Sequence, residues 1–459
     1  MDLELFPTPG LGDASYLLVS GDEAVVVDPQ RDAWRFSRAA RARGVTVRGV
    51  LETHVHNDYV SGAHELRDDW GAELYLPAGG RYAFPHTAMA DGDELTVGDL
   101  RLTALHTPGH TPEHLSWLVS SGDSPVAVFT GGSLLVGSAG RTDLLGPSFT
   151  DGLTRDQFAS LRRLGTLPDD VQVLPTHGAG SFCVSAMPDT RPTSTVGAER
   201  AGNAALGAAD LEEFTEEIGT DLMLHPAYYA AMAPINRAGA PVLRGLPRVP
   251  ALTADEVAGG GPGWVVDARD RETFAAGHIP GAVNIELNSG FGSYVGWMLP
   301  FDSPVTLVLP DPQESSLAEA LTQLIRIGWR RVSGHLDGGF PAWARDGRPV
   351  RSYPSASLQE LCAAVTAGEP MTLLDVRQPL EWGWGTLPGS TAIFVADLPQ
   401  RLAEIPTDRP AWVICSNGHR AAIAASLLDG AGVPVRLVGS GGVSEFRLHC
   451  PPVPAAAGR

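Results

Sequence analysis

Hydrophobic and polar positions in the first half of the chain form short apolar runs separated by turn residues and helical stretches. Leu17–Val19 and Ala24–Asp28 flank Gly21-Asp22 and are typical of paired strands. Arg31–Arg43 has the character of a helix, and helices dominate from Leu211 to about Met232. Further apolar runs predict strands at Val45–Thr53, Leu74–Leu76, Arg101–His106, Val126–Thr130 and Val171–Thr176.

The second half contains an internal repeat. It follows a Pro- and Gly-rich stretch, Ala238–Val249, that is typical of a linker. Val265–Ile285 (VVDARDRETFAAGHIPGAVNI) aligns without a gap to Leu373–Ile393 (LLDVRQPLEWGWGTLPGSTAI), and GGFPAW and GGVSEF recur near the ends. Each copy alternates strands with helices, which predicts a small parallel sheet covered by helices. We therefore predict an α/β protein with three domains, at 1–240, 245–352 and 353–459.

Composition limits the functions to be considered. A net charge of -20 argues against a nucleic-acid-binding protein, because phosphate binding needs a concentrated basic surface. The sequence contains no Lys, which excludes lysine-based Schiff-base chemistry. The 4 cysteines are far apart in the sequence, so we expect no disulfide and a cytoplasmic location. We expect neither a signal peptide nor a membrane-spanning segment.

Histidines gather at three places that follow or adjoin predicted strands. The first is His54-Val55-His56-Asn57-Asp58, the second is the segment HTPGHTPEH that contains His110, and the third is PTHG with His177. Pro and Gly fix the second loop, which suits a rigid mount for a ligand. Imidazole binds Zn, Fe, Cu or Ni, so the combination predicts a metal site without choosing the ion.

The H-x-H-x-D pattern, the later loop histidine and the final strand-end histidine resemble the metallo-β-lactamase superfamily. The segment FTGGSLLVGSAGRTDL is similar to the T-G-D-x-L…G-R-T-D segment of its persulfide dioxygenase branch. The resemblance implies an αββα sandwich. It places the first metal at His54, His56 and His110, and a second-site or supporting role at a set of four residues: Asp58, His177, Arg141 and Asp143. Arg141 and Asp143 either orient the metal site or form an ion pair that holds a loop.

Two positions depart from this family pattern. The last histidine of the signature is Tyr59, and the bridging Asp is Gly132. The dioxygenase branch binds one iron through two histidines and that Asp, so the implied set here is incomplete. We hypothesise that His56 completes a three-histidine site that holds Fe(2+), with Zn(2+) as the alternative.

A second candidate site lies in the last copy of the repeat. Cys415 ends a predicted strand, and a tight loop then leads into a helix. Backbone N–H groups at such a helix start point inward and stabilise an anion, so Cys415 is a candidate nucleophile toward sulfane sulfur. Arg420 adds charge there or fixes the loop. The loop residues that would surround a persulfide are Ser416, Asn417, Gly418 and His419.

The repeat resembles the rhodanese family, whose D-V-R…G-H-I-P-G-A motif and active-site loop match these segments. The resemblance implies that Cys415 carries a persulfide and that Asp375 and Arg377 support or line the pocket. Arg420 follows Cys415 more closely than in the C-x5-R loop of phosphatases, which favours sulfur over phosphate. The middle copy has Pro310–Ser316 in place of the loop and no cysteine, so we expect it to be inactive and to pack against or orient its neighbours, or to serve as an interaction surface.

Together the resemblances imply an enzyme of sulfur metabolism. It would oxidise a low-molecular-weight thiol persulfide with O2 to sulfite, and Cys415 would exchange sulfane sulfur with thiosulfate or sulfite. Two alternatives remain open: a thioester-type metal hydrolase with rhodanese modules, and a sulfurtransferase whose degenerate metal domain is a scaffold or sensor. We expect no nucleic-acid or membrane partner. The thiol carrier and a homo-oligomeric state are left open.

Overall fold

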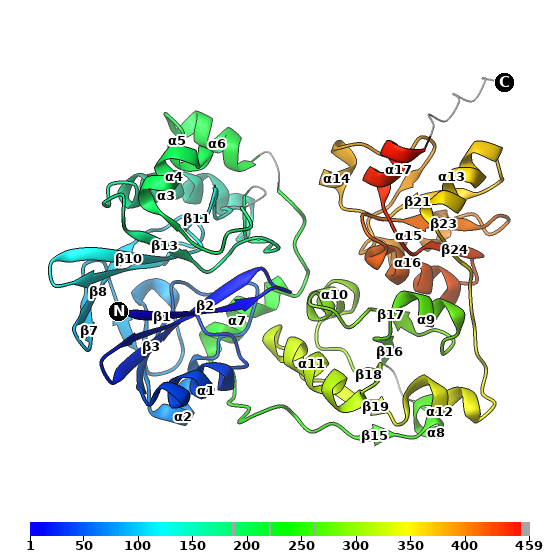
Figure 1. Cartoon of the computed structure of the whole chain (residues 1–459), viewed down its shortest axis with the longest axis horizontal. Helices are drawn as coiled ribbons and strands as arrows, with labels where there is room; N and C mark the ends of the chain where they lie inside the picture. The colour runs from blue at the N-terminus through cyan, green and yellow to red at the C-terminus, as the bar shows by residue number, and fades with distance from the viewer. Residues whose placement is uncertain (186–188, 220–221, 261–262, 451–459) are drawn as a thin grey trace. The chain divides into compact units, whose positions relative to one another are not determined.

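The computed structural model describes residues 1–185, 189–219, 222–260 and 263–450 (Figure 1). The chain divides into two units. The first contains Met1–Pro247 and Thr322–Gly328, and the second contains Arg248–Leu321 and Trp329–Arg459. The first unit holds the histidine motifs, and the second holds both copies of the repeat apart from Thr322–Gly328. This division does not separate the copies, so the predicted domain boundaries stay predictions.

The first unit contains two six-stranded sheets. The first sheet consists, in order, of β1 (Asp2–Thr8), β2 (Asp13–Ser20), β3 (Glu23–Val27), β4 (Thr46–Leu51), β5 (Glu73–Pro77) and β6 (Thr87–Met89). The second consists, in order, of β14 (Ser194–Thr195), β13 (Gln172–Pro175), β10 (Ser124–Gly131), β9 (Leu115–Ser121), β8 (Leu100–His106) and β7 (Glu94–Val97). A small separate sheet joins β11 (Leu134–Leu135) to β12 (Ser138–Ala139).

Helices cover the outer faces of these sheets. On the first sheet lie α1 (Trp34–Arg43) and α2 (Ala63–Trp70), and the unit also contains η1 (Ala78–Gly80) and α7 (Tyr229–Ala238). On the second sheet lie α3 (Pro147–Leu164), α4 (Val196–Gly202), α5 (Ala204–Gly207) and α6 (Leu211–Gly219). One apolar cluster joins the two sheets, and one further cluster joins each sheet to its helices. This layering confirms the predicted αββα sandwich.

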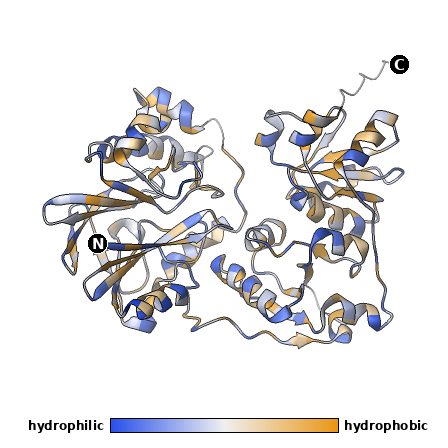
Figure 2. Cartoon of the chain, viewed as in Figure 1, coloured by the Kyte–Doolittle hydropathy of each residue, from blue (hydrophilic) through white to orange (hydrophobic). Residues whose placement is uncertain are grey.

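Strand β2 illustrates why the sequence folds in this way. Side chains alternate between the two faces of a strand. Tyr16 and Leu18 therefore enter the core between the sheets, whereas Leu17 and Val19 pack toward the helices. Because both faces are covered, every residue of this strand is buried, and hydrophobic residues recur along the sheets (Figure 2).

The second unit contains two parallel five-stranded sheets with the same connectivity. In the middle copy the order is β15 (Ala251–Leu252), β19 (Val332–Leu336), β18 (Val305–Val308), β16 (Trp264–Asp267) and β17 (Val283–Asn284). In the last copy it is β20 (Ser355–Ala356), β24 (Val435–Val438), β23 (Ala411–Ile414), β21 (Thr372–Asp375) and β22 (Thr391–Ala392). The repeated order confirms the predicted pair of parallel-sheet α/β folds.

Short helices connect these strands. The middle copy has α8 (Ala254–Ala258), α9 (Arg271–Ala276), α10 (Phe291–Met298), α11 (Gln313–Arg326) and α12 (Gly339–Arg345). The last copy has α13 (Leu358–Ala367), α14 (Pro379–Gly383), α15 (Leu398–Arg401), η2 (Leu402–Glu404), α16 (His419–Gly430) and α17 (Val443–His449). None of the described helices has the length and apolar character needed to cross a membrane.

One expectation about the cysteines is wrong. Cys362 and Cys450 form a disulfide, with their Cα atoms 5.7 Å apart. The two residues are separated by 88 positions, but Cys362 on α13 and Cys450 at the end of α17 both pack against the same small apolar core. Sequence distance is no guide to this pairing, because the helix packing brings the residues together. Cys183 and Cys415 are free and buried.

Candidate metal centre and cysteine loop

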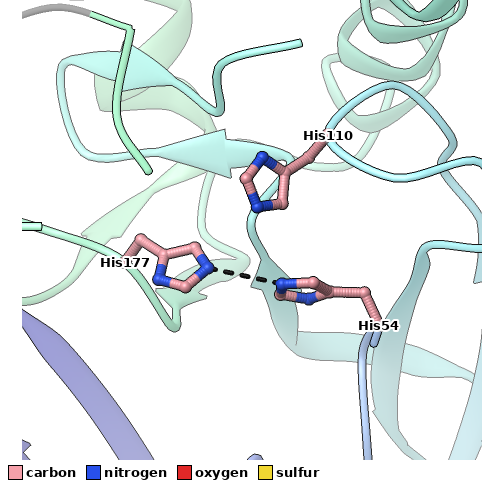
Figure 3. Close-up of side chains that lie close together, drawn as sticks. All are labelled: His54, His110 and His177. Atoms are coloured by element: carbon pink, nitrogen blue, oxygen red, sulfur yellow. Dashed lines mark hydrogen bonds between the residues drawn. The ribbon is translucent and has the colours of Figure 1, made fainter. Parts of the chain in front are cut away.

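Three histidines from three loops converge in the first unit. His54 follows β4, His110 lies in the loop between β8 and β9, and His177 follows β13. Each offers a ring nitrogen within 4.8 Å of the other two, and Nε2 of His54 lies 3.4 Å from Nε2 of His177 (Figure 3). All three are at most 1% exposed. We refer to His54, His110 and His177 as the histidine cluster.

Each ring is oriented by a contact on its outer nitrogen. Nδ1 of His110 donates to the carbonyl oxygen of Arg141 at 2.9 Å, and Nδ1 of His177 lies 2.8 Å from Oδ1 of Asp13. Nδ1 of His54 lies 2.9 Å from Oγ1 of Thr53. Such outer partners fix the tautomer and leave Nε2 free to bind a metal.

The chemistry of this donor set fits a divalent metal ion. Burial lowers the pKa of all three histidines, and the neighbouring imidazoles lower the pKa of His54 further. The rings are therefore neutral near pH 7, which is the ligand form of histidine. Among the described residues, Nε2 of His110 has no hydrogen-bond partner, as expected for a lone pair reserved for an ion.

The structure groups His177, rather than His56, with His54 and His110. Nε2 of His56 turns toward Oε2 of Glu52 at 2.9 Å and Oδ1 of Asp28 at 3.2 Å. Burial alone would lower the pKa of His56, but these two carboxylates raise it well above its ordinary value. Nε2 of His56 is thus occupied by these carboxylates, whereas Nδ1 of His56 is buried with no hydrogen-bond partner among the described residues and is the ring nitrogen left to bind a metal. The predicted ligand set of His54, His56 and His110 therefore stays a prediction.

The predicted second-site residues also lie close together. Oδ2 of Asp58 is 3.4 Å from Nδ1 of His177, and His56, Asp58 and His177 together offer ligand atoms within 4.8 Å of one another. Burial raises the pKa of Asp58 to about 7 and that of Asp13 to about 8. The side chain of His177 therefore connects the histidine cluster to a pair of buried carboxyl groups.

The two departures from the family pattern have structural consequences. Tyr59 is buried, and its hydroxyl lies 3.0 Å from Nε2 of His56 and donates to the carbonyl oxygen of Asp28 at 3.2 Å. At Gly132, an added Cβ would lie 2.3 Å from Cδ2 of His110. No side chain fits at this position without displacing His110, so the space near the cluster is shaped around glycine.

Arg141 and Asp143 combine both roles considered from the sequence. Arg141 forms a two-pronged ion pair with Asp143, with contacts of 2.7 and 2.6 Å, and also donates to the carbonyl oxygens of Phe182 and Met223. Its own carbonyl accepts from His110. The ion pair thus holds the segment that orients a candidate ligand.

Several supporting residues were not predicted from the sequence. Asp13 and Thr53 contact rings of the histidine cluster, Gln157 accepts from the backbone N–H of His110 at 3.0 Å, and Glu113 accepts from that of Val55 at 3.0 Å. These residues lie in different elements and follow no spacing rule. Only the proximity of the loops reveals them.

The cysteine loop, residues 415–419, connects β23 to α16 in the second unit. The backbone N–H of Gly418 donates to Sγ of Cys415 at 3.1 Å, and Gly418 has a φ of 90°, which favours glycine. Cys415 is 0% exposed. The loop therefore presents an N–H donor to the sulfur, as the strand–loop–helix pattern predicts.

Arg420 pairs with a residue that was not predicted. Its Nη2 donates to Oε1 of Glu381 at 2.8 Å and to Oγ of Ser416 at 2.5 Å, and Ser416 donates to Glu381 at 2.7 Å. Burial alone would raise the pKa of Glu381, but the contacts with Arg420 and Ser416 lower it below its ordinary value. Of the two roles considered for Arg420, this geometry favours fixing the loop.

Asp375 and Arg377 form a buried ion pair at 2.6 Å. Arg377 also donates to the carbonyl oxygens of Glu381 at 3.1 Å and Gly385 at 2.8 Å. The pair therefore holds the segment that supplies Glu381, which is a supporting role.

Comparison with known proteins agrees with these two architectures. The metallo-beta-lactamase superfamily model matches residues 9–177, and the rhodanese-like domain model matches residues 251–346 and 357–449. A metallo-beta-lactamase structure from Staphylococcus aureus has a TM-score of 0.66 and 30% identity, covering 73% of this chain and 98% of its own.

Curated relatives match between about a third and a half of the chain. A hydroxyacylglutathione hydrolase of Cereibacter sphaeroides is 30% identical over 255 residues, covering 52% of this chain and 94% of its own. A probable metallo-hydrolase of Bacillus subtilis is 30% identical over 184 residues, covering 36% of this chain and 84% of its own.

Proposed function

Because the chain belongs to the metallo-beta-lactamase superfamily and carries two rhodanese-like domains, we propose that it oxidises a low-molecular-weight thiol persulfide to sulfite and transfers sulfane sulfur through Cys415. The observation that carries the proposal is the histidine cluster itself. Three neutral imidazoles face one space, while Gly132 and Tyr59 remove two ligands that a dinuclear hydrolase would use.

The balanced reaction is RSS⁻ + O2 + H2O → RS⁻ + SO3²⁻ + 2H⁺. We propose that His54, His110 and His177 hold iron, which when bound supplies the redox chemistry that joins oxygen to sulfur. Asp13, Thr53 and the Arg141 carbonyl keep the three rings in orientation. His56 holds a proton between two carboxylates next to the cluster.

The second reaction takes place at the cysteine loop. The Cys415 thiolate attacks the outer sulfur of thiosulfate, so that an S–S bond forms at Sγ and the sulfur–sulfur bond of thiosulfate breaks to release sulfite. The N–H of Gly418 stabilises negative charge on Sγ. In the reverse direction sulfite accepts the sulfur. Sulfite from the first reaction could thus leave as thiosulfate.

A second candidate function is a metal-dependent thioester hydrolase. The relatives named hydroxyacylglutathione hydrolase, which match most of their own length, favour it. Zinc would then supply an activated water. Tyr59 and Gly132 replace the histidine and aspartate ligands of the family, which argues against a hydrolase.

The test is oxygen uptake by iron-loaded protein supplied with a low-molecular-weight persulfide. We expect uptake that follows iron content and yields sulfite, with at least a 100-fold loss in His110→Ala. His106→Ala is the matched control, because this exposed histidine ends β8 just before the loop that carries His110, and its Nε2 contacts the carbonyl oxygen of Pro112. Thioester turnover by zinc-loaded protein without oxygen uptake would replace the proposal with the hydrolase. Folded protein that binds no metal would favour the scaffold or sensor.

Metal content distinguishes the ligand set that includes His177 from the set that includes His56. We expect His177→Ala to lose most of its bound iron, because it removes a neutral ring nitrogen from the cluster. His56→Ala should keep at least half, because His56 is grouped with Asp58 and His177 rather than with His54 and His110. Elemental analysis of both proteins after loading measures this, and the opposite ranking would restore the set inferred from the sequence.

A further inference from the structure

The middle copy, which lacks the cysteine, contacts the cysteine loop of the last copy. Arg271 begins α9 of the middle copy, and its Nη1 donates to the carbonyl oxygen of Asn417 at 2.5 Å and to that of Gly439 at 3.2 Å. Glu286 holds the guanidinium from the other side, with contacts of 2.9 and 2.7 Å. A surface arginine would be free to rotate, whereas this one is fixed by a carboxylate.

The contacted carbonyl belongs to the peptide that serves the thiol. The carbonyl of Asn417 and the N–H of Gly418 form one planar peptide group. Arg271 therefore binds the oxygen end, while the N–H end donates to Sγ of Cys415 at 3.1 Å. A cation on the oxygen both fixes the plane of this peptide and polarises its N–H toward the sulfur.

The packing around this peptide leaves little freedom. An added Cβ at Gly418 would lie 2.1 Å from Nη1 of Arg271 and 2.4 Å from the oxygen of Gly439. The next residue, His419, is held by the same copy. Its Nε2 lies 3.3 Å from Nδ2 of Asn288, and its ring meets Tyr294 edge-on with centroids 4.5 Å apart.

The arginine has no counterpart in the other copy. In the gapless alignment of the repeats, Pro379 stands where Arg271 does. The supporting pairs Asp267–Arg269 and Asp375–Arg377, in contrast, occur in both. Arg271 is thus a feature of the Cys-less copy alone, and its side chain is directed at the neighbour's active loop.

We propose that Arg271 of the Cys-less copy is a positioning residue for sulfur transfer at Cys415, acting through the Asn417–Gly418 peptide. The proposal rests on the sulfurtransferase part of the proposed function. It gives the inactive copy a defined task, which is to complete the active loop of the other copy.

The test is steady-state sulfur transfer from thiosulfate to a small thiol by the full chain. We expect Arg271→Ala to lower kcat at least tenfold, with the KM for thiosulfate within twofold, because the altered peptide serves the reacting sulfur rather than donor binding. Arg271→Lys should recover at least part of kcat, since an ammonium can still donate to the Asn417 carbonyl. An unchanged kcat in Arg271→Ala would overturn the proposal.

Arg351→Ala is the matched control. Arg351 lies between the copies in sequence and forms a two-pronged ion pair with Asp429 of α16, at 2.7 and 2.9 Å, away from the thiol. Its loss should leave kcat within twofold. An equal fall in both variants would mean that Arg271 only docks the copies together, and would overturn the positioning role.

A second readout keeps this inference separate from the proposed function. The rate of Cys415 alkylation by iodoacetamide, followed by peptide mass spectrometry, needs no sulfur transfer. We expect at least a threefold faster rate in Arg271→Ala, because Cys415 is 0% exposed while its loop is held. Wild-type protein that transfers no sulfur would refute the proposed function, and an unchanged alkylation rate would refute the loop contact independently.

Discussion

The two rhodanese-like copies repeat the residues that build the sheet and not those that perform chemistry. In the middle copy Arg269 pairs with Asp267 at 2.5 Å and donates to the carbonyl of Gly277 at 2.9 Å. In the last copy Arg377 pairs with Asp375 at 2.6 Å and donates to Gly385 at 2.8 Å. The same ion pair thus holds the same turn twice.

The copies differ in the loop after the central strand. By sheet register Asp267 pairs with Val308 and Asp375 pairs with Ile414, so Leu309 stands where Cys415 does. The following PDP segment contains two prolines, which have no N–H to donate to a sulfur. The middle copy therefore keeps the sheet and its Asp–Arg pair although it lacks the active loop.

The largest effect is expected when the last copy loses its cysteine and so, like the middle copy, has none. Cys415→Ser should lower thiosulfate sulfur transfer at least about 1,000-fold, because serine is a far weaker nucleophile than a thiolate. Oxygen uptake should remain, because the histidine cluster lies in the other unit. Both rates measured on one preparation check this, and full transfer by the variant would refute the role of Cys415.

The next largest effect concerns the Asp–Arg ion pair that both copies contain. Arg269→Ala and Arg377→Ala should each cost about 3–5 kcal/mol in the free energy of unfolding, because each leaves a buried aspartate without its partner. Urea unfolding measures the cost. At temperatures where both variants are folded, sulfur transfer should fall more in Arg377→Ala, because Arg377 also holds the segment carrying Glu381. Equal rates would mean that the two pairs are interchangeable supports.

A smaller effect concerns the carboxylate that fixes the loop. Glu381→Gln should cost about 1–2 kcal/mol in unfolding free energy at pH 7, because it removes charged hydrogen bonds from Arg420 and Ser416. The pKa of Glu381 is lowered in the folded chain, so this contribution is complete above its unfolded value of 4.5 and is lost as pH falls through the folded value. The gap between variant and wild type should therefore shrink in acid, and a gap that is constant with pH would contradict the pairing.

The last variant is expected to recover almost no sulfur transfer. Leu309→Cys, made in the Cys415→Ser protein, should restore less than about 1% of sulfur transfer. The new thiol would face proline residues without N–H groups, and Glu314 would follow it at the spacing at which Arg420 follows Cys415. The same assay measures this outcome. Substantial recovery would show that the thiol alone distinguishes the copies.

The cysteine loop was predictable because it is continuous in sequence. A strand, a loop with Gly418 and a helix occupy adjacent positions, so the donor to Sγ follows from local backbone geometry. Glu381 and Arg271 were not predicted, because they reach the loop from other elements. The membership of the histidine cluster was predicted only in part for the same reason: His54 and His110 were named as ligands, whereas His177 was expected at the second site.

The sequence by itself determined the architecture: the αββα unit, the two parallel-sheet copies and the identity of the one that carries a cysteine. These properties follow from apolar periodicity and from residues next to one another in the chain. The tertiary structure decided which way each side chain points. His56 and His54 are two positions apart, yet Nε2 of His56 contacts Glu52 and Asp28, whereas Nε2 of His54 lies 3.4 Å from Nε2 of His177 and its Nδ1 contacts Thr53. That choice depends on which loops the packed sheets bring within hydrogen-bond distance, and sequence spacing does not encode it.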